Sequence, residues 1–165
     1  MLKSILNLVM TPTARRQDLG LLLLRLSVGA VFVFHGSQKL FGAFGGHGIA
    51  GFAGYLGQLG VPLPVMNAWL AASAEFFGGL ALLLGLATPL AAVPLTITML
   101  VAGFTAHSGF DITQGGNEYT LVLASVALAL GLNDPGRYSL QGLFVSAASV
   151  TEATPLSRQT ELLSA

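Results

Sequence analysis

Long apolar runs dominate the sequence and constrain its fold more than any other feature. They cover Leu19 to about Leu40, about Val65 to Ala87, Leu90 to about His107, and a last stretch that ends at Asn133. A helix needs about 20 mostly apolar residues to cross a bilayer. Only 8% of the 165 residues are charged, whereas soluble domains carry about 25%. The sequence therefore predicts an all-α fold, an integral membrane four-helix bundle embedded in the lipid bilayer.

The last apolar run is short, and where it starts decides the position of Glu118. Fourteen residues separate Glu118 from Asn133, which corresponds to roughly 21 Å of helix. We therefore expect this span to begin several residues before Glu118, unless the bilayer is thinner there. Glu118 is then expected to lie below the outer interface and to face the bundle.

Basic residues set the expected orientation, because short loops rich in Lys and Arg stay on the cytoplasmic side. The loops at residues 41–64 and 108–117 contain neither residue type. The basic residues outside the spans precede the first or follow the last: Lys3, Arg15, Arg16, Arg137 and Arg158. We expect a cell (inner) membrane protein with a cytoplasmic segment at 1–17, a transmembrane domain at 18–141 and a cytoplasmic tail at 142–165.

A glycine-rich segment follows the first span. Glycine recurs at every third position from Gly45 to Gly60, and Ile49, Phe52, Leu56 and Leu59 stand at helical spacing. This pattern predicts a weak helix on the outer surface, since glycine lowers helix stability. We expect it to pack as a cap against the bundle, and a mobile lid is the alternative.

Six ionisable residues fall at or near membrane depth, where each is costly and is a functional hypothesis by default. They are Arg25, His35 and Lys39 in the first span, Glu75 in the second, His107 at the end of the third, and Glu118. Arg25 and Lys39 stand 14 positions apart, close to four whole turns, so they share a helix face. From these depths we expect Arg25 to pair with Glu75 and the other four to form an outer tier. A purely structural ion-pair network is the alternative.

A polar seam of this kind suits a quinone. Quinone carbonyls need donors such as His or Lys, and quinol oxidation needs a proton acceptor. The candidate catalytic residues are His35, Glu75 and Glu118. The candidate cofactor-binding residues are Arg25, His35, Lys39 and His107. The residues leave two less favoured sites open: a haem held by His35 and His107, and a metal held by these histidines with Glu118.

Composition excludes several other kinds of chemistry. Cysteine is absent, which removes disulfides, CxxC redox motifs, thiolate zinc sites and Cys-ligated iron–sulfur clusters. The formal net charge is zero and no basic face is present, so we expect no nucleic-acid partner. The glycines of GAFGGHG lack the GK[ST] ending of a phosphate-binding loop.

Several short motifs occur in a fixed order between residues 18 and 141. They are RLSVGAVFVFHGSQKL, PLP at 62–64, AEFFGGLALLLGLAT, His107, NEYTLVL and DPGRYSL. Together they resemble the DoxX-like family of small four-span membrane proteins. That family includes a membrane subunit of archaeal thiosulfate:quinone oxidoreductase and members that assist oxidoreductase partners, so the resemblance implies quinone-linked membrane redox. Gln141 stands where the family is expected to favour Asp.

Three hypotheses of function follow. The leading one is a quinone-linked or redox-associated membrane subunit, part of a membrane oxidoreductase, with a small redox molecule in a buried polar site. The second is a non-catalytic membrane scaffold that recruits an oxidoreductase protein partner. The third is a small transporter, which the low span count disfavours unless the protein forms an oligomer. The substrate and the oligomeric state stay open.

Overall fold

The structure, a computed structural model, describes residues 13–144, and these form helices without any strand. The predicted all-α fold is confirmed. Lys3, Arg158 and most of the predicted tail lie outside the described residues. The main helices are α2 (Ala14–Phe41), α3 (Gly48–Gln58), α4 (Pro64–Leu84), α5 (Thr88–Thr105) and α6 (Glu118–Leu132), with the short 3₁₀ helices η1 (Ala43–Gly45) and η2 (Ile112–Gln114) in the loops.

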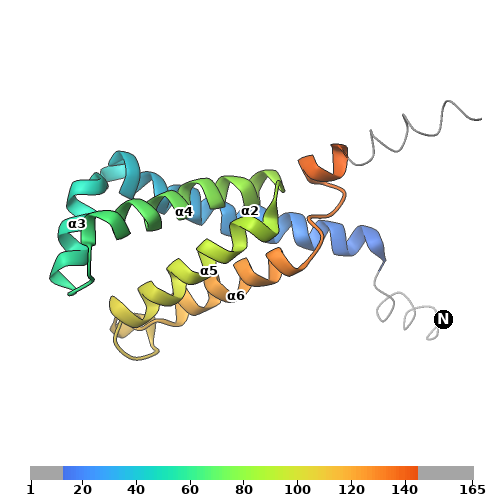
Figure 1. The fold of residues 1–165 in the computed structure, drawn as a ribbon. Helices are drawn as coiled ribbons and strands as arrows, with labels where there is room; N and C mark the ends of the chain where they lie inside the picture. Colours follow the sequence, from blue (N-terminus) through green and yellow to red (C-terminus); the bar gives the residue numbers. More distant parts are fainter. Residues whose placement is uncertain (1–12, 145–165) are drawn as a thin grey trace, which may run out of the picture.

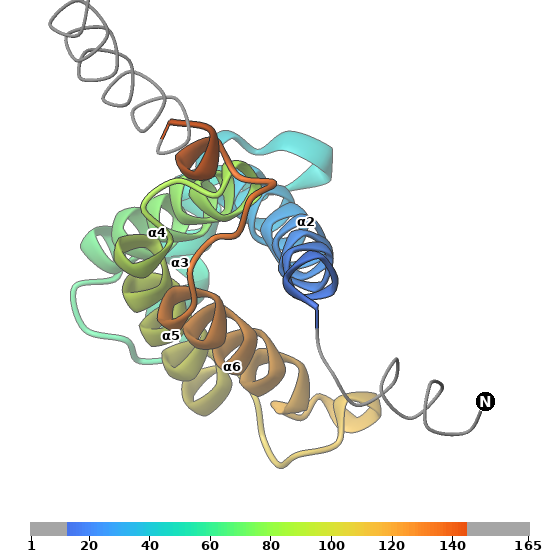
Figure 2. The same ribbon diagram turned by 90° about the vertical axis from the view of Figure 1, so that its right-hand side faces the viewer.

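The main helices pack as two pairs, α2 with α4 and α5 with α6. The pairs are joined by the tight turn between α4 and α5, and they diverge from there towards the end at which α3 lies (Figure 1). Helices α2 and α6 make few contacts, and an end-on view shows them apart (Figure 2). The bundle is therefore a wedge, closed at the turn end (the α4–α5 turn) and open at the α3 end.

Glycines allow α2 and α4 to approach closely. A β-carbon at Gly36 would overlap the backbone nitrogen of Phe76, and one at Gly79 would lie 2.8 Å from the backbone nitrogen of Val33. Within a bilayer, helices associate through such close packing rather than through a hydrophobic driving force. These contacts fix the register of the α2–α4 pair.

The turn between α4 and α5 has a clear local cause. Gly85 ends α4 in the left-handed conformation, with a φ of 65°, and Pro89 stands in the first turn of α5. Glycine tolerates positive φ, and proline suits a helix start because its missing N–H would be unpaired there. Helices α4 and α5 are therefore antiparallel neighbours.

The apolar core draws on all four long helices. Its most buried large side chains are Phe32, Leu82 and Leu95, and Met99 and Leu123 extend it towards the α3 end. Phe32, Met99 and Leu123 also line the cavity described below. The core therefore forms the floor of the wedge.

Within the described residues, three helices are long and apolar enough to cross a membrane: α2, α4 and α5. Helix α6 is shorter, with 15 residues, or roughly 22 Å. The helix itself begins at Glu118, and the residues before it, where the crossing was expected to begin, are not part of it. Backbone bonds from Asn117 N to Gly109 O and from Glu118 N to Phe110 O close the preceding residues into a loop, which leaves them no helical path.

The glycine-rich segment forms α3, as predicted. It packs against α4 and, to a lesser extent, α2, with Ala53 buried. Phe52, Leu56 and Leu59 face the open end of the wedge. The expectation of a cap packed on the bundle is confirmed.

Candidate functional site

A cavity of about 810 Å³ fills the wedge at the α3 end. Apolar side chains make up most of its wall, for example Leu56 on α3, Leu70 and Ala71 on α4, and Ile97 on α5. Ligand sites commonly have volumes of about 300–1,000 Å³ and apolar walls with a few polar groups. The polar and ionisable side chains that reach the wall are His35, Lys39, Tyr55, Asn67, Glu75, Thr98, Thr105, His107, Tyr119 and Thr120.

The ion pair of Lys39 and Glu75 is the most buried charged group of the cavity. Lys39 Nζ donates to both carboxylate oxygens at 2.5 Å. The Glu75 side chain is 2% exposed and that of Lys39 27%. The ammonium also lies 5.2 Å from the centre of the Phe52 ring, a favourable cation–π distance. The pair therefore neutralises a buried carboxylate and links α2 and α4 to α3.

The predicted pairing of Arg25 with Glu75 is wrong. Arg25 Nη2 donates to the backbone oxygen of Tyr138 at 2.8 Å, and its guanidinium packs against Gly85. The ten residues from Glu75 to Gly85 span about 15 Å of helix. Glycine contacts set a register that places Lys39, rather than Arg25, opposite Glu75.

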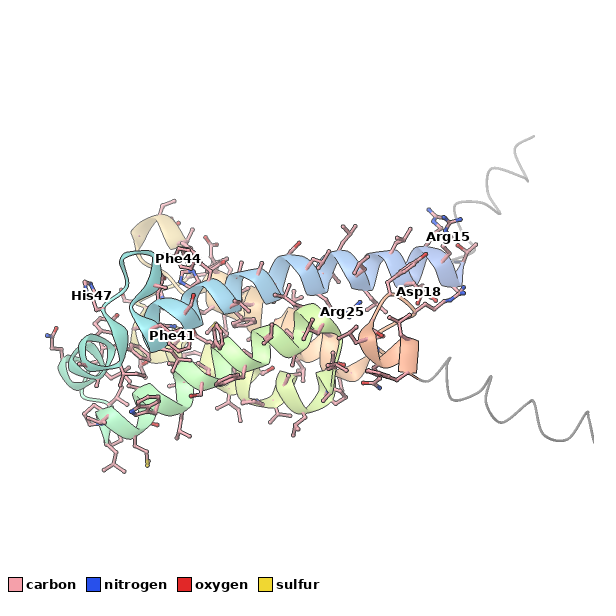
Figure 3. The ribbon with its side chains drawn as sticks, turned by 90° about the horizontal axis from the view of Figure 1, so that it is seen from above. Arg15, Asp18, Arg25, Phe41, Phe44 and His47 are labelled. Atoms are coloured by element: carbon pink, nitrogen blue, oxygen red, sulfur yellow. The ribbon has the colours of Figure 1, made fainter. Side chains whose placement is uncertain are left out.

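Arg25 instead holds the turn end together. It lies between α2 and the end of α4 (Figure 3) and is 1% exposed. Among the described residues, its Nε and Nη1 have no hydrogen-bond acceptor. A guanidinium near a helix C-terminus is favoured by the negative end of the helix dipole. Arg25 does not line the cavity, so its place in the predicted seam is not supported by the geometry.

The two candidate histidines do line the cavity, from opposite sides of the wedge. His35 is on α2, and His107 follows α5. Nδ1 of His35 lies 3.0 Å from Oε1 of Gln38, and Nδ1 of His107 lies 3.2 Å from the backbone oxygen of Gly115. In the described part of the chain, no three His, Asp or Glu side chains are placed to hold a metal ion.

Glu118 faces its own loop rather than the bundle interior, contrary to the prediction. Its Oε1 accepts a hydrogen bond from the backbone nitrogen of Ile112 at 2.9 Å, and it is absent from the cavity wall. The cause is that α6 begins no earlier than Glu118, which therefore occupies its first helical position. An acidic residue there is stabilised by the helix dipole and by free backbone N–H groups.

Asp111 fixes the same loop and gives it a pH dependence. It accepts hydrogen bonds from Thr113 Oγ1 at 2.8 Å, Thr113 N at 2.9 Å and Gln114 Nε2 at 3.1 Å. These bonds, that of the Thr113 side chain foremost, hold the pKa of Asp111 below its usual range. A carboxylate with a lowered pKa stabilises the folded loop above its ordinary pKa and loses this effect as the pH falls through the lowered value.

We expect the Asp111 carboxyl to titrate below the usual aspartate range, and Thr113→Val to move its pKa upwards. The variant removes the hydroxyl donor and keeps the β-branched shape. The check is the pH dependence of the Asp111 carboxyl ¹³C shift in both proteins. An identical titration in the two would contradict the assigned role of Thr113.

Three residues at the site, of which Tyr55 and Tyr119 line the cavity and Gln38 does not, were not singled out as functional in the sequence. Gln38, which holds His35, is three positions from it on the same helix face, so an i, i+3 test would have found it. Tyr55 and Tyr119 look like ordinary interfacial aromatics. They reach the cavity only because the helix pairs diverge.

Comparison with known proteins gives a family for this chain. The DoxX family model matches residues 20–108, which is more than half of the chain. The chain belongs to the DoxX family. It is therefore a membrane protein of that family, as the resemblance implied. The matched region contains Arg25, His35, Lys39, Glu75 and His107.

A relative of this DoxX protein is "Putative oxidoreductase CatD" from Bacillus subtilis (strain 168). The two are 32% identical over 114 residues, which cover 68% of this chain and 79% of the relative. No solved structure matches the chain at a significant level.

Proposed function

We propose that this DoxX protein is a quinone-linked subunit of a membrane redox system and binds a quinone-type molecule in the wedge cavity. The observation that carries the proposal is the largely apolar cavity of about 810 Å³ beside the Lys39–Glu75 ion pair. The similarity to a protein named as an oxidoreductase supports the same reading.

The wall chemistry suits such a ligand. Leu70 and Ile97 give the rim an apolar character and are themselves 60% and 56% exposed, so an isoprenoid tail reaches the cavity from the bilayer. The Lys39–Glu75 pair is neutral overall, which favours a neutral polar ring over an ion. Quinones combine a neutral ring that has polar edges with an apolar tail.

The proposed roles follow from position. His35, Lys39 and His107 contact the polar edge of the ligand, and Glu75 holds Lys39 and exchanges protons with the site. Arg25 and Glu118 act at a distance: Arg25 fixes the turn end, and Glu118 fixes the loop before α6. Neither is proposed to touch the ligand.

The proposed orientation places the turn end at the cytoplasmic face of the inner membrane. Arg15 and Asp18 lie at that end in Figure 3, and the backbone nitrogen of Arg137 donates to Asp18. Basic residues gather on the cytoplasmic side. The cavity then opens towards the outer leaflet, and an oxidoreductase partner supplies or accepts electrons.

Organic extraction of protein purified from membranes tests the proposal. We expect an isoprenoid quinone in the extract, and about tenfold less of it from Ala71→Trp, which fills the cavity. Leu80→Trp is the matched control, since Leu80 is on the same helix, 39% exposed and outside the cavity wall. An extract free of quinone from wild-type protein, together with no binding of added quinone or quinol, rejects the proposal in favour of a non-catalytic scaffold.

A further inference from the structure

Hydrogen-bond directions around the cavity carry information about which form of a redox ligand it holds. We infer that the site is built for the reduced, hydroxylated form of a quinone-type ring, a quinol, and binds it more tightly than the oxidised form. The inference rests on the proposed function and adds a choice between two ligand states. It follows from the imidazole and hydroxyl groups of the wall, because their hydrogen atoms already donate to other atoms of the protein.

His35 has a fixed tautomer. Nε2 of Gln38 donates to the backbone oxygen of Phe44 at 3.4 Å, so Oε1 is the amide atom that faces His35. A carbonyl oxygen only accepts, and therefore Nδ1 of His35 carries the hydrogen. Turning the amide over would set Oε1 of Gln38 against the oxygen of Phe44. In the neutral ring, Nε2 is then an acceptor.

His107 reaches the same state through a different partner. Its Nδ1 faces the backbone oxygen of Gly115 at 3.2 Å, and a backbone oxygen offers no hydrogen. Nδ1 is again the donor, which leaves Nε2 with a lone pair. In the described part of the chain, neither Nε2 has a partner, and both histidines line the cavity. Each wall of the wedge thus offers an imidazole acceptor.

Two hydroxyl groups of the wall also use their hydrogen atoms within the protein. Thr105 Oγ1 donates to the backbone oxygen of Val101, and Thr120 Oγ1 donates to that of Asn117, both at 2.8 Å. Each hydroxyl has one hydrogen, so only its lone pairs remain for a ligand. Both threonines line the cavity and add acceptors to the imidazole nitrogens.

Donors on the wall are fewer. Lys39 spends two of its three N–H groups on Glu75, and the Asn67 amide spends one of its two on the backbone oxygen of Pro62. The remaining wall hydroxyls, those of Tyr55, Thr98 and Tyr119, donate or accept equally well. A quinol hydroxyl satisfies an imidazole acceptor. A quinone carbonyl in the same place sets acceptor against acceptor and leaves both groups unpaired where the ligand covers them, which is the expensive arrangement. The acceptor excess therefore selects the hydroxylated ring.

The test measures the affinities of decylubiquinol and decylubiquinone for the purified full chain by anaerobic equilibrium dialysis. Both ligands are measured in the same buffer, at a pH of about 8. We expect decylubiquinol to bind at least about tenfold more tightly. His35→Gln and His107→Gln should each reduce this ratio, because glutamine presents a donor as readily as an acceptor. His47→Gln is the control, since His47 is exposed and outside the cavity wall.

The outcomes separate the two claims. Equal binding of both forms, or tighter binding of decylubiquinone, overturns the preference for quinol and leaves the proposed function standing. Binding of neither form overturns the proposed function and the inference with it. If a histidine variant is not monodisperse, the ratio in the wild-type protein decides alone.

Discussion

Lys39→Met is expected to lower the free energy of unfolding by about 3 kcal/mol, the lower end of the range for breaking a buried ion pair. The lower end applies because the Lys39 side chain is 27% exposed. The variant leaves the Glu75 carboxylate, only 2% exposed, without its only hydrogen-bond donor among the described residues. It also removes the cation that lies on the Phe52 ring. Unfolding by SDS titration in mixed micelles measures the loss.

The double variant Lys39→Met/Glu75→Leu distinguishes the effect of an unpaired buried charge from that of lost packing. Replacing both partners of a buried pair by apolar groups is often neutral or stabilising, so we expect stability to return to within about 1 kcal/mol of wild type. Quinone binding should nevertheless be lost in the double variant, since the polar edge of the cavity has gone. If the double variant is as unstable as Lys39→Met, the defect comes from packing, and the ion pair is not what stabilises this part of the wedge.

The helices could be predicted from the sequence because their signals are local. Apolar runs of about 20 residues have few alternatives to a membrane helix, and Gly85, Thr88 and Pro89 mark the turn between α4 and α5. The loop before α6 was not predicted, because backbone hydrogen bonds close it. Such bonds depend on the path of the chain and leave little trace in composition.

Depth alone brought together four of the six candidate site residues. His35, Lys39, Glu75 and His107 do meet at one cavity, since costly groups in a membrane gather where they find partners. The partner of Glu75 was misassigned because the depth of each residue was counted from the expected ends of its helix. An error of a few residues at each end displaces the register by more than a side chain's reach. Glycine contacts between α2 and α4 settle that register, and they are visible only in three dimensions.

Because those glycine contacts set the register, Gly36→Ala is expected to destabilise the protein by about 3 kcal/mol, as overpacking of a tight contact does. A β-carbon there overlaps the backbone nitrogen of Phe76 and lies 2.7 Å from its Cα. The contact is with backbone, so no side chain can rotate away and α4 itself must move. Because Glu75 precedes Phe76, that shift also pulls the carboxylate from Lys39 and should weaken quinone binding.

Gly20→Ala provides the matched control on the same helix. A β-carbon at Gly20 meets nothing within 4 Å, so only the helix preference of alanine remains, which stabilises by about 0.5–1 kcal/mol. The same substitution should thus change the free energy of unfolding in opposite directions at two positions of α2, as measured by SDS unfolding. Quinone binding should weaken only in Gly36→Ala. Equal effects at both positions would mean that α2 and α4 are not in glycine-mediated contact. The register that places Lys39 opposite Glu75 would then have to be abandoned along with the cavity wall it builds.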